Sequence, residues 1–88
     1  GLPALFHLEL NNTKVTDTGL EHLNAMSNLS HLGLNNTQVS DAGLQRLMGL
    51  SRLNFLTLNG TNVTANGVAI LQEALPNCDI RWDEGNTK

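Results

Sequence analysis

The stretch VTDTGLEHL, residues 15–23, returns almost unchanged as VSDAGLQRL at residues 39–47 and more loosely as VTANGVAIL at residues 63–71. Each copy starts 24 residues after the previous one, so the recurrence is strict. The same offset relates two columns of apolar residues without any insertion. They are Leu8, Leu32, Leu56 and Ile80, and Leu10, Leu34, Leu58 and Trp82. Because a fixed period of this length is the signature of a repeat architecture, the chain contains four copies of one unit in a single frame.

Each repeat combines an alternating pattern with a helical one. Leu8 and Leu10 alternate with a period of two, as in a strand with one buried face, whereas Leu20 and Leu23 follow helical spacing. The unit is therefore expected to be a strand, a turn and a helix. A single unit of 24 residues cannot bury enough apolar surface to offset its backbone entropy, so the repeats are expected to stack.

The start of each expected helix carries residues typical of helix caps. Thr16, Ser40 and Thr64 are good N-cap types, and Asp17 and Asp41 lie in the first turn, where the helix dipole favours a carboxylate. Capping is the role that these residues are expected to have. Each helical pattern also contains a glycine, which costs about 1 kcal/mol relative to alanine and is expected to permit close packing of helix on strand. These glycines are Gly19, Gly43 and Gly67.

Composition and charge narrow the class of protein. With 40% apolar and 15% charged residues, the chain is expected to form one globular domain. Its net charge of −3 and its five scattered Lys and Arg residues form no basic stripe, so no nucleic-acid partner is expected. No apolar run approaches the roughly 20 residues that span a bilayer, so membrane insertion is not expected. The single cysteine, Cys78, excludes an internal disulfide and is expected to be a structural thiol.

The frame L-x-x-L-x-L-x-x-T-x-V-T-D-x-G-L resembles the leucine-rich repeat family, and within it the short bacterial repeats that are similar to the ribonuclease-inhibitor-like class. The resemblance implies an α/β solenoid, a curved stack of strand-turn-helix units with a parallel sheet on the concave face and helices outside. About 3.5 repeats would fill residues 1–82, with a C-terminal cap, LPNCDIRW, at about 75–82 and a polar tail at 83–88. In this family an asparagine often ties the turn to the neighbouring repeat, and the implied substitute here is a threonine ladder. It would consist of Thr13, Thr37 and Thr61.

The N-terminal end of the chain carries two further expectations. Gly1 and Leu2 fall in register with the end of a repeat, so the sequence is expected to be a piece of a longer array. The first strand, near residues 5–10, is then an unpaired sheet edge with leucines exposed beneath it. Because such an edge is a template for pairing with another chain, end-to-end self-association is expected for the isolated segment.

The frame also places outward-facing strand residues in columns on the presumed concave face. In the leucine-rich repeat family such columns contact a protein or peptide, and the resemblance implies the same here. The residues expected to bind the partner are His7, Glu9, His31, Asn35, Phe55, Thr57, Asp79 and Arg81. Phe55 is the strongest anchor candidate because an outward aromatic ring is a common interface type, although a scattered surface aromatic is the alternative. Gly33 would leave a dimple beside it.

Other functions stay open at this point. His7 and His31 would lie on adjacent strands about 4.8 Å apart, within reach of one metal ion, although two solvated histidines on a binding face are the preferred interpretation. A structural spacer with no ligand of its own is a second alternative to a binding module. The sequence holds no catalytic triad, phosphate loop or zinc-protease motif, so neither an enzyme nor a cofactor is expected. The compartment is undecided, with an extracellular or cell-envelope location favoured.

Overall fold

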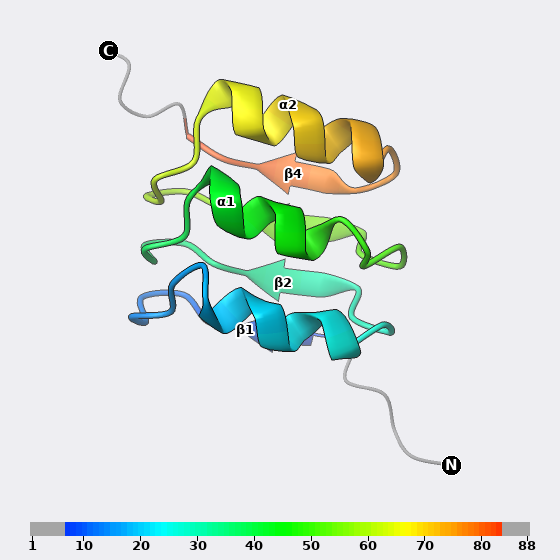
Figure 1. The fold of residues 1–88 in the computed structure, drawn as a ribbon, viewed down its shortest axis with the longest axis horizontal. Helices are drawn as coiled ribbons and strands as arrows, with labels where there is room; N and C mark the ends of the chain where they lie inside the picture. The colour runs from blue at the N-terminus through cyan, green and yellow to red at the C-terminus, as the bar shows by residue number, and fades with distance from the viewer. Residues whose placement is uncertain (1–6, 84–88) are drawn as a thin grey trace.

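Four short strands form one parallel sheet. The computed structural model describes residues 7–83, and within them β1 (His7–Glu9), β2 (His31–Gly33), β3 (Phe55–Thr57) and β4 (Asp79–Arg81) lie side by side in chain order (Figure 1). Their register pairs His7 with His31, His31 with Phe55, and Phe55 with Asp79. Each partner therefore lies one repeat further along the chain, as the period predicts.

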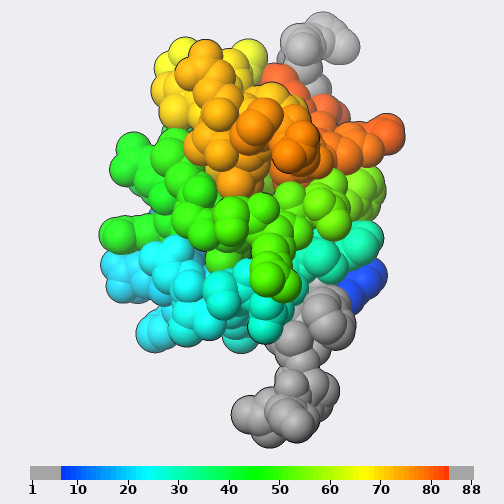
Figure 2. Space-filling view, turned by 90° about the vertical axis from the view of Figure 1, so that its right-hand side faces the viewer, coloured from blue at the N-terminus to red at the C-terminus, as the bar shows by residue number. Residues whose placement is uncertain are grey.

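Helical segments connect the strands and lie on one face of the sheet. They are η1 (Gly19–Ala25), a 3-10 helix; α1 (Asp41–Leu44), which continues into the 3-10 helix η2 (Gln45–Leu47); and α2 (Ala65–Ala74). Figure 2 shows the two layers from the side, with the repeats following one another from blue to red. The α/β class and the parallel sheet are thus confirmed. Within the described residues, no helix is long and apolar enough to cross a membrane.

The type of helix follows the spacing of its inward residues. These are Leu20, Leu23, Met26 and Leu29 in the first crossover, Leu44, Leu47, Leu50 and Leu53 in the second, and Val68, Leu71, Leu75 and Cys78 in the third. A step of three residues matches the 3.0 residues per turn of a 3-10 helix, and it runs through the first crossover, where η1 is wholly 3-10. The second crossover also contains a step of four, from Leu44 to Met48, and it combines the α-helix α1 with the 3-10 helix η2. The third contains a step of four, from Leu71 to Leu75, and forms an α-helix of 10 residues.

The core lies between the sheet and the helical layer. Leu32 and Leu56, on the two central strands, are fully buried, whereas Leu8 on β1 and Ile80 on β4 are only partly buried. The difference arises because the end strands have a neighbouring layer on one side only. Among the described strands β1 is an edge, as expected; residues 5 and 6 of the predicted strand lie outside the described residues.

A tight turn follows each of the first three strands. Asn12 and Asn36 have φ values of 63° and 59°, and Gly60, at the same place in the third repeat, has φ of 72°. Asparagine and glycine tolerate this left-handed conformation best, which explains the NNT, NNT and NGT triplets.

The expected threonine ladder between repeats does not form. Each threonine hydroxyl donates instead to a carbonyl of its own repeat, three residues earlier; for Thr37 the acceptor is Leu34 at 2.8 Å. Thr13 and Thr61 make the same bond at 2.7 Å. These threonines therefore close their own turns, because a hydroxyl on a short side chain reaches the nearby carbonyl more easily than the next repeat.

Two aspartates that were expected to cap their own helices instead tie neighbouring repeats together. Asp17 accepts hydrogen bonds from the Ser40 N–H at 2.7 Å and the Ser40 hydroxyl at 2.5 Å. Asp41 makes the same pair of bonds to Thr64, at 2.8 and 2.6 Å. Asp41 does lie in the first turn of α1, as expected, whereas Asp17 precedes η1. The hydrogen bonds of both carboxylates go to the start of the following helix, one repeat away.

Two of the three predicted residues, Ser40 and Thr64, lie at N-cap positions, and one of them makes a capping bond through its side chain. Thr64 Oγ1 accepts from the Gly67 N–H at 3.2 Å and is a true N-cap. Ser40 lies at the N-cap position of α1, but its hydroxyl donates to Asp17 and makes no capping bond. Thr16 is not a cap, because η1 begins only at Gly19.

The glycines of the helical segments make room for these aspartates. A Cβ atom on Gly43 would lie far inside van der Waals contact with the Asp17 carboxylate, and one on Gly67 would collide with Asp41. On Gly19 it would press against the Val15 side chain. The close approach was expected between helix and strand. For Gly43 and Gly67 it lies instead between one repeat and the carboxylate of the repeat before it.

Candidate functional site

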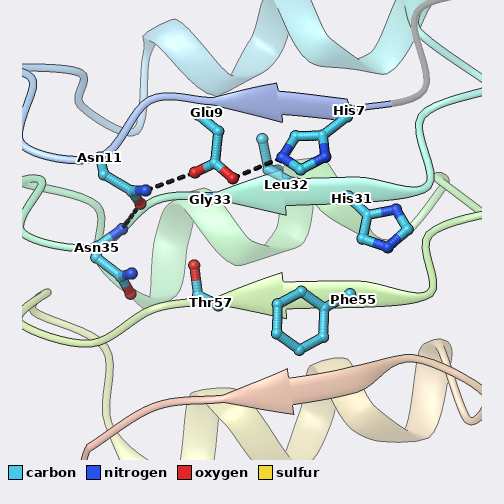
Figure 3. Close-up of a pocket in the computed structure, with 9 residues that line it drawn as sticks. All are labelled: His7, Glu9, Asn11, His31, Leu32, Gly33, Asn35, Phe55 and Thr57. Carbon is cyan, nitrogen blue, oxygen red and sulfur yellow. Dashed lines mark hydrogen bonds and ion pairs between the residues drawn. The ribbon is translucent and has the colours of Figure 1, made fainter.

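The face of the sheet opposite the helices is the candidate site, and we call it the open sheet face. It consists of the strand side chains that point away from the core. They are His7, Glu9, His31, Gly33, Phe55, Thr57, Asp79 and Arg81. Figure 3 views this face with the helices behind the strands. All of the predicted strand residues of the site are therefore on the same side of the sheet.

An aromatic row runs across three neighbouring strands. The rings of His7 and His31 stack with centroids 5.3 Å apart and planes within 8° of parallel. Phe55 continues the row, tilted by 44° with its centroid 6.0 Å from that of His31. The parallel register produces this row because it aligns the first residue of each strand, as the repeat frame predicted.

A hollow of about 180 Å³ lies next to the aromatic row, above Gly33 (Figure 3). Its lining comes from three strands and the turns after two of them. The lining residues are His7, Glu9, Asn11, His31, Leu32, Gly33, Asn35, Phe55 and Thr57. The dimple expected at Gly33 is thus present. It is part-filled, because the Glu9 and Asn11 side chains extend from the neighbouring repeat to where a Gly33 side chain would be.

Glu9 is the charged residue of the hollow. Its Oε2 accepts from His7 Nε2 at 2.5 Å, and its Oε1 accepts from Asn11 Nδ2 at 2.5 Å. The hydrogen bond from His7 is the main reason that the pKa of Glu9 lies below its ordinary value of 4.5; the nearby histidine charge and Asn11 act in the same direction. The carboxylate is solvent-exposed and ionised at neutral pH.

Asn35 was expected to be free to bind a partner, but it also makes hydrogen bonds that hold the fold. Its side-chain Oδ1 accepts from the Asn59 N–H at 2.8 Å, and its own N–H donates to Asn11 Oδ1 at 2.8 Å. Asparagines in this column therefore tie successive turns together, which is the role that the resemblance assigned to the threonines. Asn35 still lines the hollow, so it serves the fold first and the site second.

The two predicted residues on β4 pair with each other. Arg81 donates to both carboxylate oxygens of Asp79, at 2.9 and 3.0 Å. These hydrogen bonds raise the pKa of Arg81 above its ordinary value. Arg81 lines a second, broader hollow of about 570 Å³ between β3 and β4, with Phe55 and Trp82 among its other walls. Asp79 lines neither of these two hollows.

The stacked histidines do not extend into a larger ligand set. Among residues 7–83, no group of three or more His, Cys, Asp or Glu side chains is arranged to hold a metal ion. His7 is bonded to Glu9, and His31 Nδ1 lies 3.0 Å from the Ser30 hydroxyl. The metal hypothesis thus rests on the ring stack alone.

Two further residues stand out away from the open sheet face. Cys78 is a free and buried thiol, and desolvation raises its pKa to about 11, so it is protonated and inert at neutral pH. Ile70, on the outer side of α2, is 48% exposed and is the one large apolar side chain so exposed among the described residues. Neither lines the hollow above Gly33 or belongs to the aromatic row.

The structure brings together six of the eight predicted site residues around one hollow. The other two, Asp79 and Arg81, form their own pair on β4. Sequence reasoning missed Asn11 as a support for Glu9, and Trp82 as a wall of the second hollow. The repeat frame carried a signal for both, because each lies directly beside a predicted outward residue.

Comparison with protein-family models gave no match for this chain, and comparison with curated proteins gave none either. The function must therefore be argued from the open sheet face itself.

Proposed function

We propose that the repeats are leucine-rich repeats of a solenoid, and that the open sheet face binds a protein or peptide without catalysing a reaction. One observation carries this proposal: His7, His31 and Phe55 form a continuous aromatic row beside a hollow, on the face that the helices leave uncovered. Aromatic side chains in such a position are typical anchors of protein interfaces.

Some outward side chains of the repeats are not used to hold the fold, and this supports a binding role. The Thr57 side chain makes no hydrogen bond to the described part of the chain, and Phe55 is only partly buried. Side chains that are not needed to hold the fold are available to a partner. A mixture of rings, one carboxylate and amide groups suits an extended segment, which offers side chains and backbone groups together.

A catalytic role is less well supported by the same geometry. Ser30 and His31 are in contact, but a nucleophile and base also need a carboxylate that orients the base. The Glu9 carboxylate is bonded to His7 instead. We therefore propose that the open sheet face binds a partner and does not catalyse a reaction.

The test is a selection of peptides from a phage-displayed random library on the immobilised protein. Binders would be compared on wild type, on Phe55→Thr, which keeps a strand-forming residue, and on Ile70→Gln, which removes an apolar side chain from the helical side. The proposal predicts peptides that bind wild type and Ile70→Gln equally and lose at least about tenfold in affinity on Phe55→Thr. The absence of any enriched peptide, or binding that only Ile70→Gln abolishes, would instead favour a structural spacer or a helical-side interface.

A further inference from the structure

We propose that the hollow above Gly33 is a subsite for an arginine side chain of the partner, with its guanidinium group between the Glu9 carboxylate and the Phe55 ring. This inference rests on the proposed function, because it names the chemistry that the open sheet face selects. Four features of the hollow carry it.

The first feature is the charge of the lining. Among the described residues of the lining, Glu9 is the one that is charged when the histidines are neutral, and none of these residues is a lysine or an arginine. The cation closest by strand position, Arg81, is on β4, where it is paired with Asp79. While the histidines are neutral, the hollow attracts a cation and repels an anion, and this charge complementarity decides the class of the occupant.

The second feature is the state of Glu9. Its carboxylate is held in place by His7 and Asn11, one on each oxygen, while it stays exposed to solvent. A carboxylate has about four lone-pair positions, so two bonds leave acceptor capacity for a ligand. The lowered pKa favours the ionised form of this carboxyl group. The negative charge is thus fixed in direction before a partner arrives.

The third feature is the aromatic wall. His31 and Phe55 line the hollow on the side away from Glu9 along the strands, as the sticks in Figure 3 show. A planar cation stacks on such rings, and a ring face attracts positive charge. Gly33 has no side chain, so the floor of the hollow leaves room for the methylene groups of the incoming side chain.

The fourth feature is an unused acceptor. The Thr57 hydroxyl lines the hollow on β3 and makes no hydrogen bond to the rest of the described chain. Arginine presents five N–H donors in one plane and stacks through that plane, whereas lysine is a compact point charge. The hollow offers a carboxylate, a hydroxyl and a ring on different sides. This arrangement suits the planar guanidinium group of arginine better than the point charge of lysine. The occupant is therefore arginine in preference to lysine.

The inference can be tested with small probes that do not depend on the natural partner. The peptide acetyl-Gly-Arg-Gly-amide would be titrated into the isotope-labelled protein, and the amide of Gly33 and the ring protons of Phe55 followed by NMR. The same peptide with citrulline, which keeps the shape of arginine without its charge, is the matched probe. The protein variants are Glu9→Gln, Phe55→Leu and, as a control on the helical side, Ile70→Gln.

The proposal predicts saturable shifts at Gly33 and Phe55 with the arginine peptide, and binding about tenfold weaker with citrulline or with Glu9→Gln. Phe55→Leu should weaken binding about threefold, because the ring face is lost while apolar contact remains. Ile70→Gln should bind as wild type does. A lysine peptide should bind more weakly than the arginine peptide.

Three results would overturn the inference: no saturable shift at Gly33, equal binding of arginine and citrulline, or an undiminished affinity in Glu9→Gln whose spectrum shows it folded. None of them removes the proposed function. Library peptides that need Phe55 but contain no arginine would leave the open sheet face a binding surface and assign its hollow to another side chain. If the library selection fails but the arginine peptide still binds, the hollow binds an arginine side chain and the rest of the open sheet face does not bind a peptide.

Discussion

The two sides of each repeat use their polar side chains in different ways. On the turn and helix side, Asp17 binds Ser40 and Asp41 binds Thr64, so a carboxylate of one repeat holds the next. On the open sheet face, Glu9 bonds to neighbours only two residues away in its own repeat, and Arg81 does the same with Asp79. The first kind of contact crosses repeats and builds the stack, whereas the second shapes a surface.

This difference predicts which substitutions affect folding and which affect binding. Changes at the ties between repeats remove contacts that no other group replaces. Changes on the open sheet face leave every tie between the aspartates and the following helices in place. The predictions below test this separation, beginning with the largest expected effect.

Gly43→Ala should be the most destabilising of these changes. The added methyl group overlaps the Asp17 carboxylate and presses on Leu20, so the tie to Ser40 must break or the backbone must move. A loss of about 3 kcal/mol in the free energy of unfolding is expected, measured by urea denaturation. Gly49→Ala is the matched control, because a Cβ atom there meets nothing within 4 Å. Equal stabilities of the two variants would show that the close approach at Gly43 is unimportant.

Asp17→Ala should cost about 2 kcal/mol in the free energy of unfolding, because two charge-assisted bonds to Ser40 are lost in a partly buried place. Asp79→Ala, which removes a carboxylate from the open sheet face, should stay within about 0.5 kcal/mol of wild type. In the Asp17→Ala background the cost of Gly43→Ala should fall, since the group that it overlaps is gone. Strict additivity of the two changes would contradict the contact.

Thr64→Ala should cost about 1 kcal/mol more than Thr16→Ala in denaturant unfolding. Thr64 caps α2 through the Gly67 N–H and also donates to Asp41, whereas Thr16 caps nothing. If the two alanine variants are equally stable, the two threonines serve the same purpose and the asymmetry between the repeats is illusory.

The smallest effect is on the titration of Glu9, followed by NMR of its carboxyl group. Its pKa lies below 4.5, so the His7 bond stabilises the fold above that pH and the contribution is lost as the pH falls through the lowered pKa. His7→Ala removes the main cause and should move the pKa up toward 4.5. Ile70→Gln, on the other side of the molecule, should leave it unchanged. An unaltered pKa in His7→Ala would mean that the ring does not bond to Glu9.

The sequence predicted the strands and their register because one offset of 24 residues fixes both. It predicted the hollow because Gly33 interrupts a column of larger outward side chains. It also held the signal for the 3-10 helices, since Leu44, Leu47 and Leu50 are each three residues apart. Reading that spacing simply as helical loses the distinction from α2.

The roles of the aspartates and asparagines could not be predicted from the sequence. An aspartate after a serine or threonine is equally suited to cap its own helix and to bind the next one. The role that the aspartate takes depends on how closely successive repeats approach each other. That distance is not a property of any single repeat. The same reason explains why Asn35, and not Thr37, joins neighbouring turns.

The central claim is that the open sheet face serves binding and not folding, and Phe55→Thr tests it most directly. Its free energy of unfolding and its affinity for a library-selected peptide would be measured on the same preparation. The account predicts a stability within about 1 kcal/mol of wild type and an affinity at least about tenfold lower. An unchanged affinity, or a loss of stability as large as that of Gly43→Ala, would show that Phe55 belongs to the fold and that the partner binds elsewhere.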